Sequence, residues 1–147
     1  NSFKLLSMSK IVPYLTFNGN CREAMLFYQD CIGGELKFNT IGESPLSEKM
    51  PPKMKQSILH ATLANNEFAL TATDMVPSEG KSTGNNISLI LNCDSETQIK
   101  ERFYNLSEGG IIDHALEITY WGATLGGLTD KYGNRWMLIL QPPQDQL

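Results

Sequence analysis

Two stretches of the chain, Phe27-Tyr28-Gln29-Asp30-Cys31-Ile32-Gly33-Gly34 and Phe103-Tyr104-Asn105-Leu106-Ser107-Glu108-Gly109-Gly110, decide the fold. Each has a Phe-Tyr pair followed after four residues by Gly-Gly, and the offset between them is 76 residues (103 − 27). The same offset places Leu15 on Leu91. Internal similarity at a fixed spacing is the signature of a duplicated structural unit. We therefore predict two copies of one module.

The first copy is predicted to open with a strand and a helix. Residues 11–17 are rich in β-forming side chains and end at Asn18-Gly19-Asn20, which is typical of a turn. Asn20 and Glu23 have the spacing of a capping box at a helix start. Gly33-Gly34 is expected to end this helix, because glycine accepts the left-handed conformation found there. The apolar face of the helix is expected to consist of Ala24, Phe27, Tyr28 and Cys31.

The second copy follows the same pattern. Residues 87–93 are predicted to form its strand, with Asp94 or Ser95 as the helix cap and Gln98 as the capping-box partner of Ser95. Gly109-Gly110 is expected to end the helix. The apolar stripe of this helix is predicted to be Ile99, Phe103 and Leu106.

Three more strands are predicted after each helix. In the two copies they are residues 35–40, 57–64 and 67–74, and residues 111–120, 123–129 and 135–140. Asn65-Asn66 is expected to form a tight hairpin turn, since asparagine tolerates positive φ. Asp130 is expected to shape the corresponding turn with Gly133. Residues 43–55 contain prolines and no periodicity, so we expect a flap there.

This pattern predicts an α+β fold of tandem βαβββ modules. The first module is assigned to residues 8–77 and the second to residues 85–142, with residues 78–84 as the linker between them. We expect one compact two-module domain, because 147 residues with 41% hydrophobic content suit a single domain with a sizeable core.

Composition narrows the classes of function. The formal net charge is −4 and no basic stretch occurs, so nucleic acid and anionic membrane surfaces are poor partners. The longest apolar runs are strand-sized, well short of the roughly 20 residues that span a bilayer. Three cysteines without a C-x-x-C pair, and a polar N-terminal stretch unlike a signal peptide, favour a cytoplasmic protein.

The motifs resemble those of a known superfamily. Pro13-Tyr14-Leu15-x-Phe17 leads into Cys21-Arg22-Glu23-Ala24, and the chain ends with Trp121-Gly122 and Thr129-Asp130-x-Tyr132-Gly133-Asn134-x-Trp136. These residues are similar to the PhnB-like branch of the glyoxalase/bleomycin-resistance/extradiol-dioxygenase (vicinal oxygen chelate) superfamily. The resemblance implies an eight-stranded, cup-shaped mixed sheet with two helices packed outside it, and a homodimer.

The resemblance also implies where metal-using relatives place their ligands. The corresponding positions here are Val12 (or Pro13 after a one-residue slip), Ala69, Ser88 and Met137. None of these side chains carries an imidazole or a carboxylate, which divalent metals on this scaffold require. We therefore expect no metal site and no cofactor. The chain also has no strand leading into a glycine-rich loop and helix, so a methyltransferase-type nucleotide cofactor is not indicated.

Strand alternation predicts which side chains line the cup instead. The Asn65-Asn66 hairpin is expected to pair Thr62 with Ala69 and His60 with Thr71. Trp136 is expected to face the helices, whereas Trp121 is expected near the rim. The predicted ligand-binding residues share hydrogen-bonding or polarizable side chains, and they are Tyr14, His60, Thr71, Ser88, Asn92, Trp121 and Met137.

Individual side chains leave alternatives open. His60 is the candidate catalytic residue, as a general base or hydrogen-bond donor, and it can equally be a neutral histidine satisfied by Thr71. Tyr14 and Trp121 can contact a ligand or pack internally. His114 beside Asp113 is expected to be exposed. Cys21 lies in the first helical turn, where the helix N-terminus can lower a thiol pKa, but no neighbouring base is evident.

Three functions remain open at this stage. The first is a metal-independent protein that binds an unknown small organic molecule. The second is a metal-free enzyme, an isomerase or proton-transfer catalyst, that uses His60 with Tyr14 or Thr71. The third is a structural or regulatory subunit whose cup is filled by its own side chains.

Overall fold

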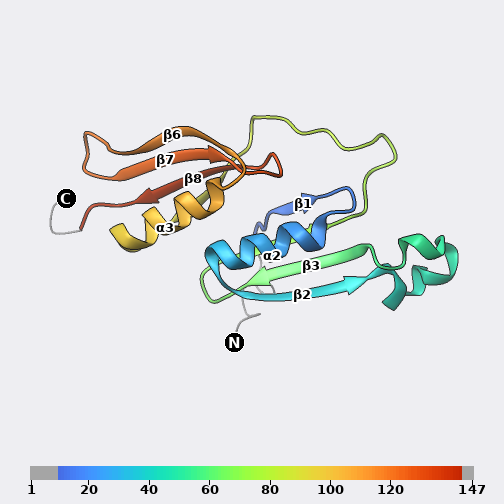
Figure 1. The fold of residues 1–147 in the computed structure, drawn as a ribbon. Coiled ribbons are helices and arrows are strands. Elements are labelled where there is room, and N and C mark those ends of the chain that lie inside the picture. The colour runs from blue at the N-terminus through green and yellow to red at the C-terminus, as the bar shows by residue number, and fades with distance from the viewer. Residues whose placement is uncertain (1–9, 144–147) are drawn as a thin grey trace. The chain divides into compact units, whose positions relative to one another are not determined.

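The computed structural model describes residues 10–143, which fall into two compact units divided between Ser82 and Thr83. We call them the N-unit and the C-unit. Within the described residues, each unit contains one α-helix and one mixed four-stranded sheet (Figure 1). The predicted α+β fold of tandem modules is confirmed. Residues 8 and 9, with which the first predicted module begins, lie outside the described range.

The two units share one topology. The N-unit sheet has the order β1-β4-β3-β2 and the C-unit sheet the order β5-β8-β7-β6, with the first strand parallel to the last in each. The N-unit elements are β1 (Tyr14–Thr16), α2 (Cys21–Ile32), β2 (Glu35–Thr40), β3 (Ile58–Ala64) and β4 (Ala69–Thr73). The C-unit elements are β5 (Leu89–Asn92), α3 (Glu96–Ser107), β6 (Ile111–Ile118), β7 (Thr124–Thr129) and β8 (Arg135–Leu140).

The first strand of each unit is shorter than predicted. β1 begins at Tyr14 instead of residue 11, and β5 begins at Leu89 instead of residue 87. Ile11 and Ile87 are consequently 99% and 73% exposed. Pro13 explains the late start of β1, because proline has no N–H to donate to a ladder. Its carbonyl still accepts a hydrogen bond from the Thr71 amide at 3.1 Å.

The helices bury the predicted faces, with one shift between the copies. In α2 Tyr28 is fully buried, whereas in α3 the buried aromatic residue is Phe103 and Tyr104 is 57% exposed. Tyr28 therefore corresponds in burial to Phe103, an offset of 75 (103 − 28) instead of the 76 read from the Phe-Tyr pairs. Successive residues on a helix are rotated by about 100°. A one-residue difference in how each helix lies on its sheet therefore decides whether the Tyr or the Phe of the Phe-Tyr pair is buried.

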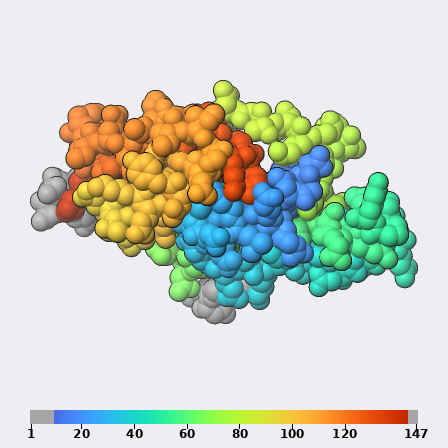
Figure 2. Space-filling model, in the orientation of Figure 1, coloured from blue at the N-terminus to red at the C-terminus, as the bar shows by residue number. Residues whose placement is uncertain are grey.

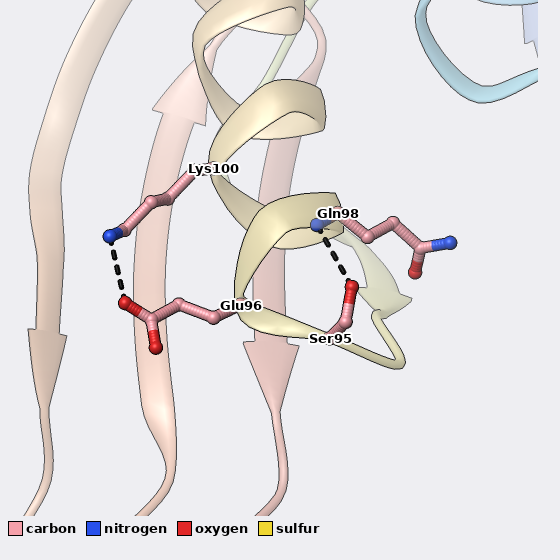
Figure 3. A network of polar contacts seen from close by, with 4 residues as sticks. All are labelled: Ser95, Glu96, Gln98 and Lys100. Atoms are coloured by element: carbon pink, nitrogen blue, oxygen red, sulfur yellow. Dashed lines mark hydrogen bonds and ion pairs between the residues drawn. The ribbon is translucent and has the colours of Figure 1, made fainter.

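The start of α3 confirms the predicted cap at Ser95 but not the predicted capping box with Gln98. The Ser95 hydroxyl accepts a hydrogen bond from the Gln98 amide at 3.0 Å (Figure 3). The Gln98 side-chain oxygen accepts one from the Asp94 amide at 2.8 Å, instead of from the Ser95 amide as a capping box requires. Both bonds satisfy amides that have no partner inside the helix. One turn further, Lys100 pairs with Glu96 at 2.8 Å on the exposed surface.

The start of α2 is built differently. Asn20 makes no side-chain cap hydrogen bond, so the predicted Asn20/Glu23 capping box is wrong. A carboxylate from the end of β4 takes its place. Asp74 accepts hydrogen bonds from the amides of Gly19 (2.9 Å) and Cys21 (3.0 Å) through one oxygen, and from the Ile58 amide (2.9 Å) through the other.

This carboxylate also changes the expectation for Cys21. Burial, with a further contribution from the Asp74 charge, raises the pKa of the Cys21 thiol to about 12, although Arg22 opposes the shift. The expected lowering by the helix N-terminus is therefore wrong. Burial also raises the pKa of Cys93, and Cys31 is buried as well, so no described thiol is set up as a nucleophile.

The hairpin between β3 and β4 also differs from the prediction. Its loop is four residues long, because Ala64 pairs with Ala69, and the described chain has no non-glycine residue at positive φ. Asn65 acts through its side chain, whose oxygen accepts bonds from the amides of Glu67 (2.7 Å) and Phe68 (3.0 Å). The longer loop pairs Thr62 with Thr71 instead of Ala69. A shift of two residues leaves every side chain on its predicted face.

Residues 41–57 form the predicted irregular segment between β2 and β3. They contain three short 3-10 helices, η1 (Ile41–Glu43), η2 (Pro45–Lys49) and η3 (Pro52–Met54). In Figure 2 the segment forms the teal-green end of the N-unit. Backbone bonds from Ile41 to Ser57 and from Gly42 to Lys55 close its base, and Ile41 is fully buried. The segment is thus anchored at both ends.

The turn between β7 and β8 confirms the role predicted for Asp130. One carboxylate oxygen accepts bonds from the amides of Tyr132 (2.9 Å) and Asn134 (3.0 Å), and Gly133 has a φ of 89°. The other oxygen accepts a bond from the Trp136 indole N–H at 2.9 Å. Trp136 is 4% exposed and belongs to the helix-side core, as predicted.

We predict that Asp74→Ala lowers the free energy of unfolding by about 3 kcal/mol, because three backbone N–H groups lose their acceptor. Asp74→Asn retains one oxygen and should lose less. Asp30→Ala, which removes the same charge from an exposed site on α2, should change stability by no more than about 0.5 kcal/mol. Urea denaturation followed by circular dichroism measures all three, and equal losses in Asp74→Ala and Asp30→Ala would contradict the assignment.

The two helix starts provide a second prediction. Ser95→Ala should lower the free energy of unfolding by about 1 kcal/mol, since the Gln98 amide loses its cap. Asn20→Ala occupies the same position before α2 and should cost less than about 0.5 kcal/mol, because Asn20 makes no cap hydrogen bond. Thermal denaturation of the two variants compares them directly, and the prediction fails if Asn20→Ala is the more destabilised.

Candidate functional site

Each sheet has one face covered by its own helix and one that is not. We call the second the helix-free face of the unit. In the N-unit, Arg22 of α2 lies 4.7 Å over the ring of Phe38 on β2, so Phe38 marks the helix side. In the C-unit, a Cβ at Gly126 would meet Phe103 of α3 at 2.7 Å, so Gly126 marks the helix side. Residues of opposite parity point to the helix-free face.

The helix-free face of the N-unit collects polar side chains. The register aligns Tyr14, Thr71, Thr62 and Lys37 across all four strands. Tyr14 is 58% exposed, whereas Thr62 and Thr71 are 7% and 9% exposed. His60 lies on the same face two residues from Thr62. The structure therefore brings the three predicted residues of this unit, Tyr14, His60 and Thr71, onto one surface.

The contacts of His60 differ from those expected. Its Nε2 lies 3.3 Å from the Thr62 hydroxyl, and its ring stacks against Tyr14 with centroids 6.2 Å apart and an interplanar angle of 27°. Thr71, the partner considered for His60, donates its hydroxyl to the Pro13 carbonyl at 2.6 Å. His60 is exposed, so an imidazole, a phenol and a hydroxyl meet at an accessible place.

The helix-free face of the C-unit is more apolar. Ile90 pairs with Met137 and Asn92 with Ile139 across β5 and β8. Ile90 is 62% exposed, Asn92 is exposed, and Ser88 stands one residue before β5. The predicted residues Ser88, Asn92 and Met137 therefore share this face. Together with Ile90 and Ile139, these residues contribute aliphatic and thioether surface, a hydroxyl and an amide to this face.

Trp121 lies apart from these residues, in the turn between β6 and β7. Thr119 and Ala123 close this turn through two hydrogen bonds of the Thr119 hydroxyl and one between their backbones. The Trp121 ring is edge-on to that of Tyr120, with centroids 4.9 Å apart, and it is 45% exposed. Because Thr124 pairs with Leu140, the turn lies at the same end of the sheet as Asn92.

Two further residues, His114 and Arg135, lie on the helix-free face of the C-unit. The sequence analysis did not select them as ligand-binding residues. His114 of β6 pairs with Gly127, and a Cβ at Gly127 would lie 3.1 Å from the Met137 sulfur and 3.8 Å from His114 Cδ2. Arg135 has the same parity on β8 as Met137. The alternation that assigned Met137 to the lining applies equally to Arg135, so the signal was present in the sequence. His114 was expected to be exposed, and it is.

Metal-ligating side chains are not clustered in the part of the chain that the structure describes. No group of three or more His, Cys, Asp or Glu side chains there is arranged to hold a metal ion. The glycines of the Gly126-Gly127 pair lie inside β7, where Gly126 permits close packing between α3 and the sheet. Among residues 10–143, no helix has the length and apolar character required to cross a bilayer.

Comparison with known proteins gives relatives that match over most of the chain. Protein YjdN of Escherichia coli K12 is 34% identical over 144 residues, which cover 90% of this chain and 97% of YjdN. The structure of protein PA1353 from Pseudomonas aeruginosa is 38% identical, covers 91% of this chain and 98% of that chain, and superposes with a TM-score of 0.80. A Bacillus cereus protein described as a putative 3-demethylubiquinone-9 3-methyltransferase, PhnB protein, is 27% identical, with coverages of 90% and 99% and a TM-score of 0.69.

More distant structures agree in fold alone. A glyoxalase/bleomycin resistance protein/dioxygenase family enzyme from Burkholderia phytofirmans is 12% identical, covers 88% of this chain and 97% of that chain, and has a TM-score of 0.60. Residues 9–139 match the family model described as 3-demethylubiquinone-9 3-methyltransferase. The chain therefore belongs to this PhnB-like family, whose fold is that of the glyoxalase/bleomycin-resistance/dioxygenase superfamily.

Proposed function

We propose that this chain is a metal-independent small-molecule-binding protein of the glyoxalase/bleomycin-resistance type, which holds an organic ligand by hydrogen bonds and van der Waals contacts. One observation carries the proposal. Each unit leaves one sheet face uncovered by its own helix, and these faces carry Tyr14, His60, Asn92 and Met137 on rigid strands. Mixed apolar and hydrogen-bonding walls of this kind suit an organic molecule with a few polar atoms.

The residues at the family's ligand positions support a site without metal. Val12, Ala69, Ser88 and Met137 offer two aliphatic groups, a hydroxyl and a thioether. Hard and borderline divalent cations bind imidazole, carboxylate or thiolate donors instead. Because the four side chains at these positions are poor ligands for such cations, we do not propose a metal-dependent glyoxalase or dioxygenase reaction.

The family description names a methyl transfer, and we do not extend that activity to this chain. A methyl donor built on a nucleotide is usually bound where a strand runs through a glycine-rich loop into a helix. In the described residues the turn before α2 contains one glycine, Gly19, and residues 93–95 before α3 contain none. Among residues 10–143, the only adjacent glycines inside a strand are Gly126 and Gly127, and they permit close packing within the C-unit.

The proposal includes a cellular setting. With a formal net charge of −4 and three buried cysteines, we propose a cytoplasmic homodimer that does not bind nucleic acid or membranes. The partner is then a small organic molecule of the host cell.

Native mass spectrometry of the protein purified from its host tests the proposal. We expect a mass excess from a retained organic molecule that disappears on denaturation, and a substoichiometric metal content in parallel elemental analysis. The same spectra report whether the protein is a dimer. One equivalent of a transition metal held by side chains of this chain, or a retained methyl donor, would contradict the proposal.

A second candidate function is favoured by the contacts of His60. The Tyr14–His60–Thr62 group places a titratable imidazole beside a phenol and a hydroxyl, which is material for proton transfer without a metal. This alternative is a metal-free isomerase or proton-transfer enzyme.

The two functions separate in one experiment. The molecule identified by mass spectrometry is returned to the protein in D2O, and exchange of its acidic C–H hydrogens is followed by NMR. A binding protein is expected to give no exchange above the buffer rate, and His60→Ala should weaken binding without abolishing it. Catalysed exchange that is lost in His60→Ala, but kept in the control variant Asp30→Ala at an exposed site of α2, would establish the enzyme instead.

A further inference from the structure

Within the part of the chain that the structure describes, Arg135 is the one arginine on a helix-free face, and one of its N–H donors lacks a hydrogen-bond partner. It is the first residue of β8 and lies two residues from Met137 on the same side of the sheet. Its Nε atom is buried and has no hydrogen-bond partner among residues 10–143. The other two arginines are differently placed, because Arg22 lies over the Phe38 ring on the helix side and Arg102 belongs to α3 and interacts with Cys93.

An unpartnered guanidinium N–H is unusual at a buried position. Arginine stays protonated at every physiological pH, so the group cannot relieve the cost by losing its charge. A buried donor without an acceptor costs stability, and nearly all such groups in native proteins have a partner or a bound ligand. Arg135 is therefore a place where a bound acceptor would restore a missing interaction.

The neighbours of Arg135 do not provide that acceptor. Thr129, its cross-strand partner on β7, donates its hydroxyl to the Asp113 carboxylate at 2.8 Å. Asp113 is the acidic side chain on this part of the face, and it makes no ion pair with Arg135. On the other side, Leu89 pairs with Trp136, so the hydroxyl of Ser88 is level with Arg135.

We infer that Arg135 is the anion-recognition residue of the C-unit face, and that the ligand of this protein carries an oxyanion, a carboxylate or a phosphate. The inference rests on the proposed function and specifies the chemical class of its ligand. A planar oxyanion accepts two parallel hydrogen bonds from Nε and a terminal nitrogen of one guanidinium, and the Arg135 side chain turns on binding so that its buried Nε–H faces the ligand. The aliphatic and thioether surface of Ile90 and Met137 lies further along the face for the apolar part of such a ligand.

NMR of the full-length ¹⁵N-labelled protein tests this assignment. The chain has three arginines, so three Nε–H resonances are expected, and the one lost in Arg135→Lys belongs to Arg135. Benzoate and phenyl phosphate are the probes, and benzamide is the neutral control. We expect both anions to shift the Arg135 Nε–H resonance in a saturable manner and benzamide to leave it in place. The tighter of the two anions identifies the carboxylate or the phosphate as the ligand group.

The variants complete the test. Arg135→Lys keeps the positive charge but removes the planar pair of N–H donors, and it should weaken anion binding by about tenfold or more. Arg22→Lys is the matched control in the N-unit and should leave binding unchanged. A shift of the Arg135 resonance in Asp113→Asn, together with no response to either anion, would show an internal partner and overturn the inference.

Failure of the anion-binding inference can be distinguished from failure of the proposed function. If the protein retains an electrically neutral organic molecule and does not respond to the two anions, the inference is wrong and the proposed function stands. If a retained transition metal explains binding instead, the proposed function is wrong, whatever the anions do at Arg135.

Discussion

The carboxylate of Asp74 is the interaction on which the N-unit depends. Its two oxygens accept three backbone amides, from the turn after β1, from the first residue of α2 and from the first residue of β3. Segments far apart in the sequence are thereby fixed at one point, which sets where the helix begins. Asp130 has a comparable role in the C-unit, where it holds a turn and the Trp136 indole. In both cases a buried or half-buried carboxylate is stable because N–H groups surround it.

The two faces of each sheet carry different kinds of side chain. The helix side takes the large apolar residues, such as Tyr28, Phe103 and Trp136, and supplies the stability of each unit. The helix-free side keeps hydroxyl, imidazole, phenol and guanidinium groups that a well-packed core would exclude. Side chains on paired strands are held in a fixed register, so the polar groups of each helix-free face keep fixed positions relative to one another.

The sequence allowed the sheet face of most candidate-site residues to be predicted, because alternation along a strand decides the face of every residue. It placed Tyr14, His60, Thr71, Ser88, Asn92 and Met137 on helix-free faces, although the hairpin register was wrong by two residues. Contacts were harder to predict than faces. His60 meets Thr62 and Tyr14 instead of Thr71, since the loop length at Asn65 decides which residues lie opposite each other. The same alternation places Arg135 on the face of Met137.

The sequence by itself determined the duplicated βαβββ pattern, the helix ends at Gly33 and Gly109, and the cap at Ser95, because these depend on local backbone preferences and on residues a few positions apart. Only the tertiary structure decided that Asp74 would replace the cap of Asn20, that Cys21 would have a raised pKa, and that Tyr104 would be exposed where Tyr28 is buried. Each of these depends on groups brought together from distant parts of a unit. Desolvation and hydrogen-bond competition act on that spatial arrangement, which the spacing along the chain does not specify.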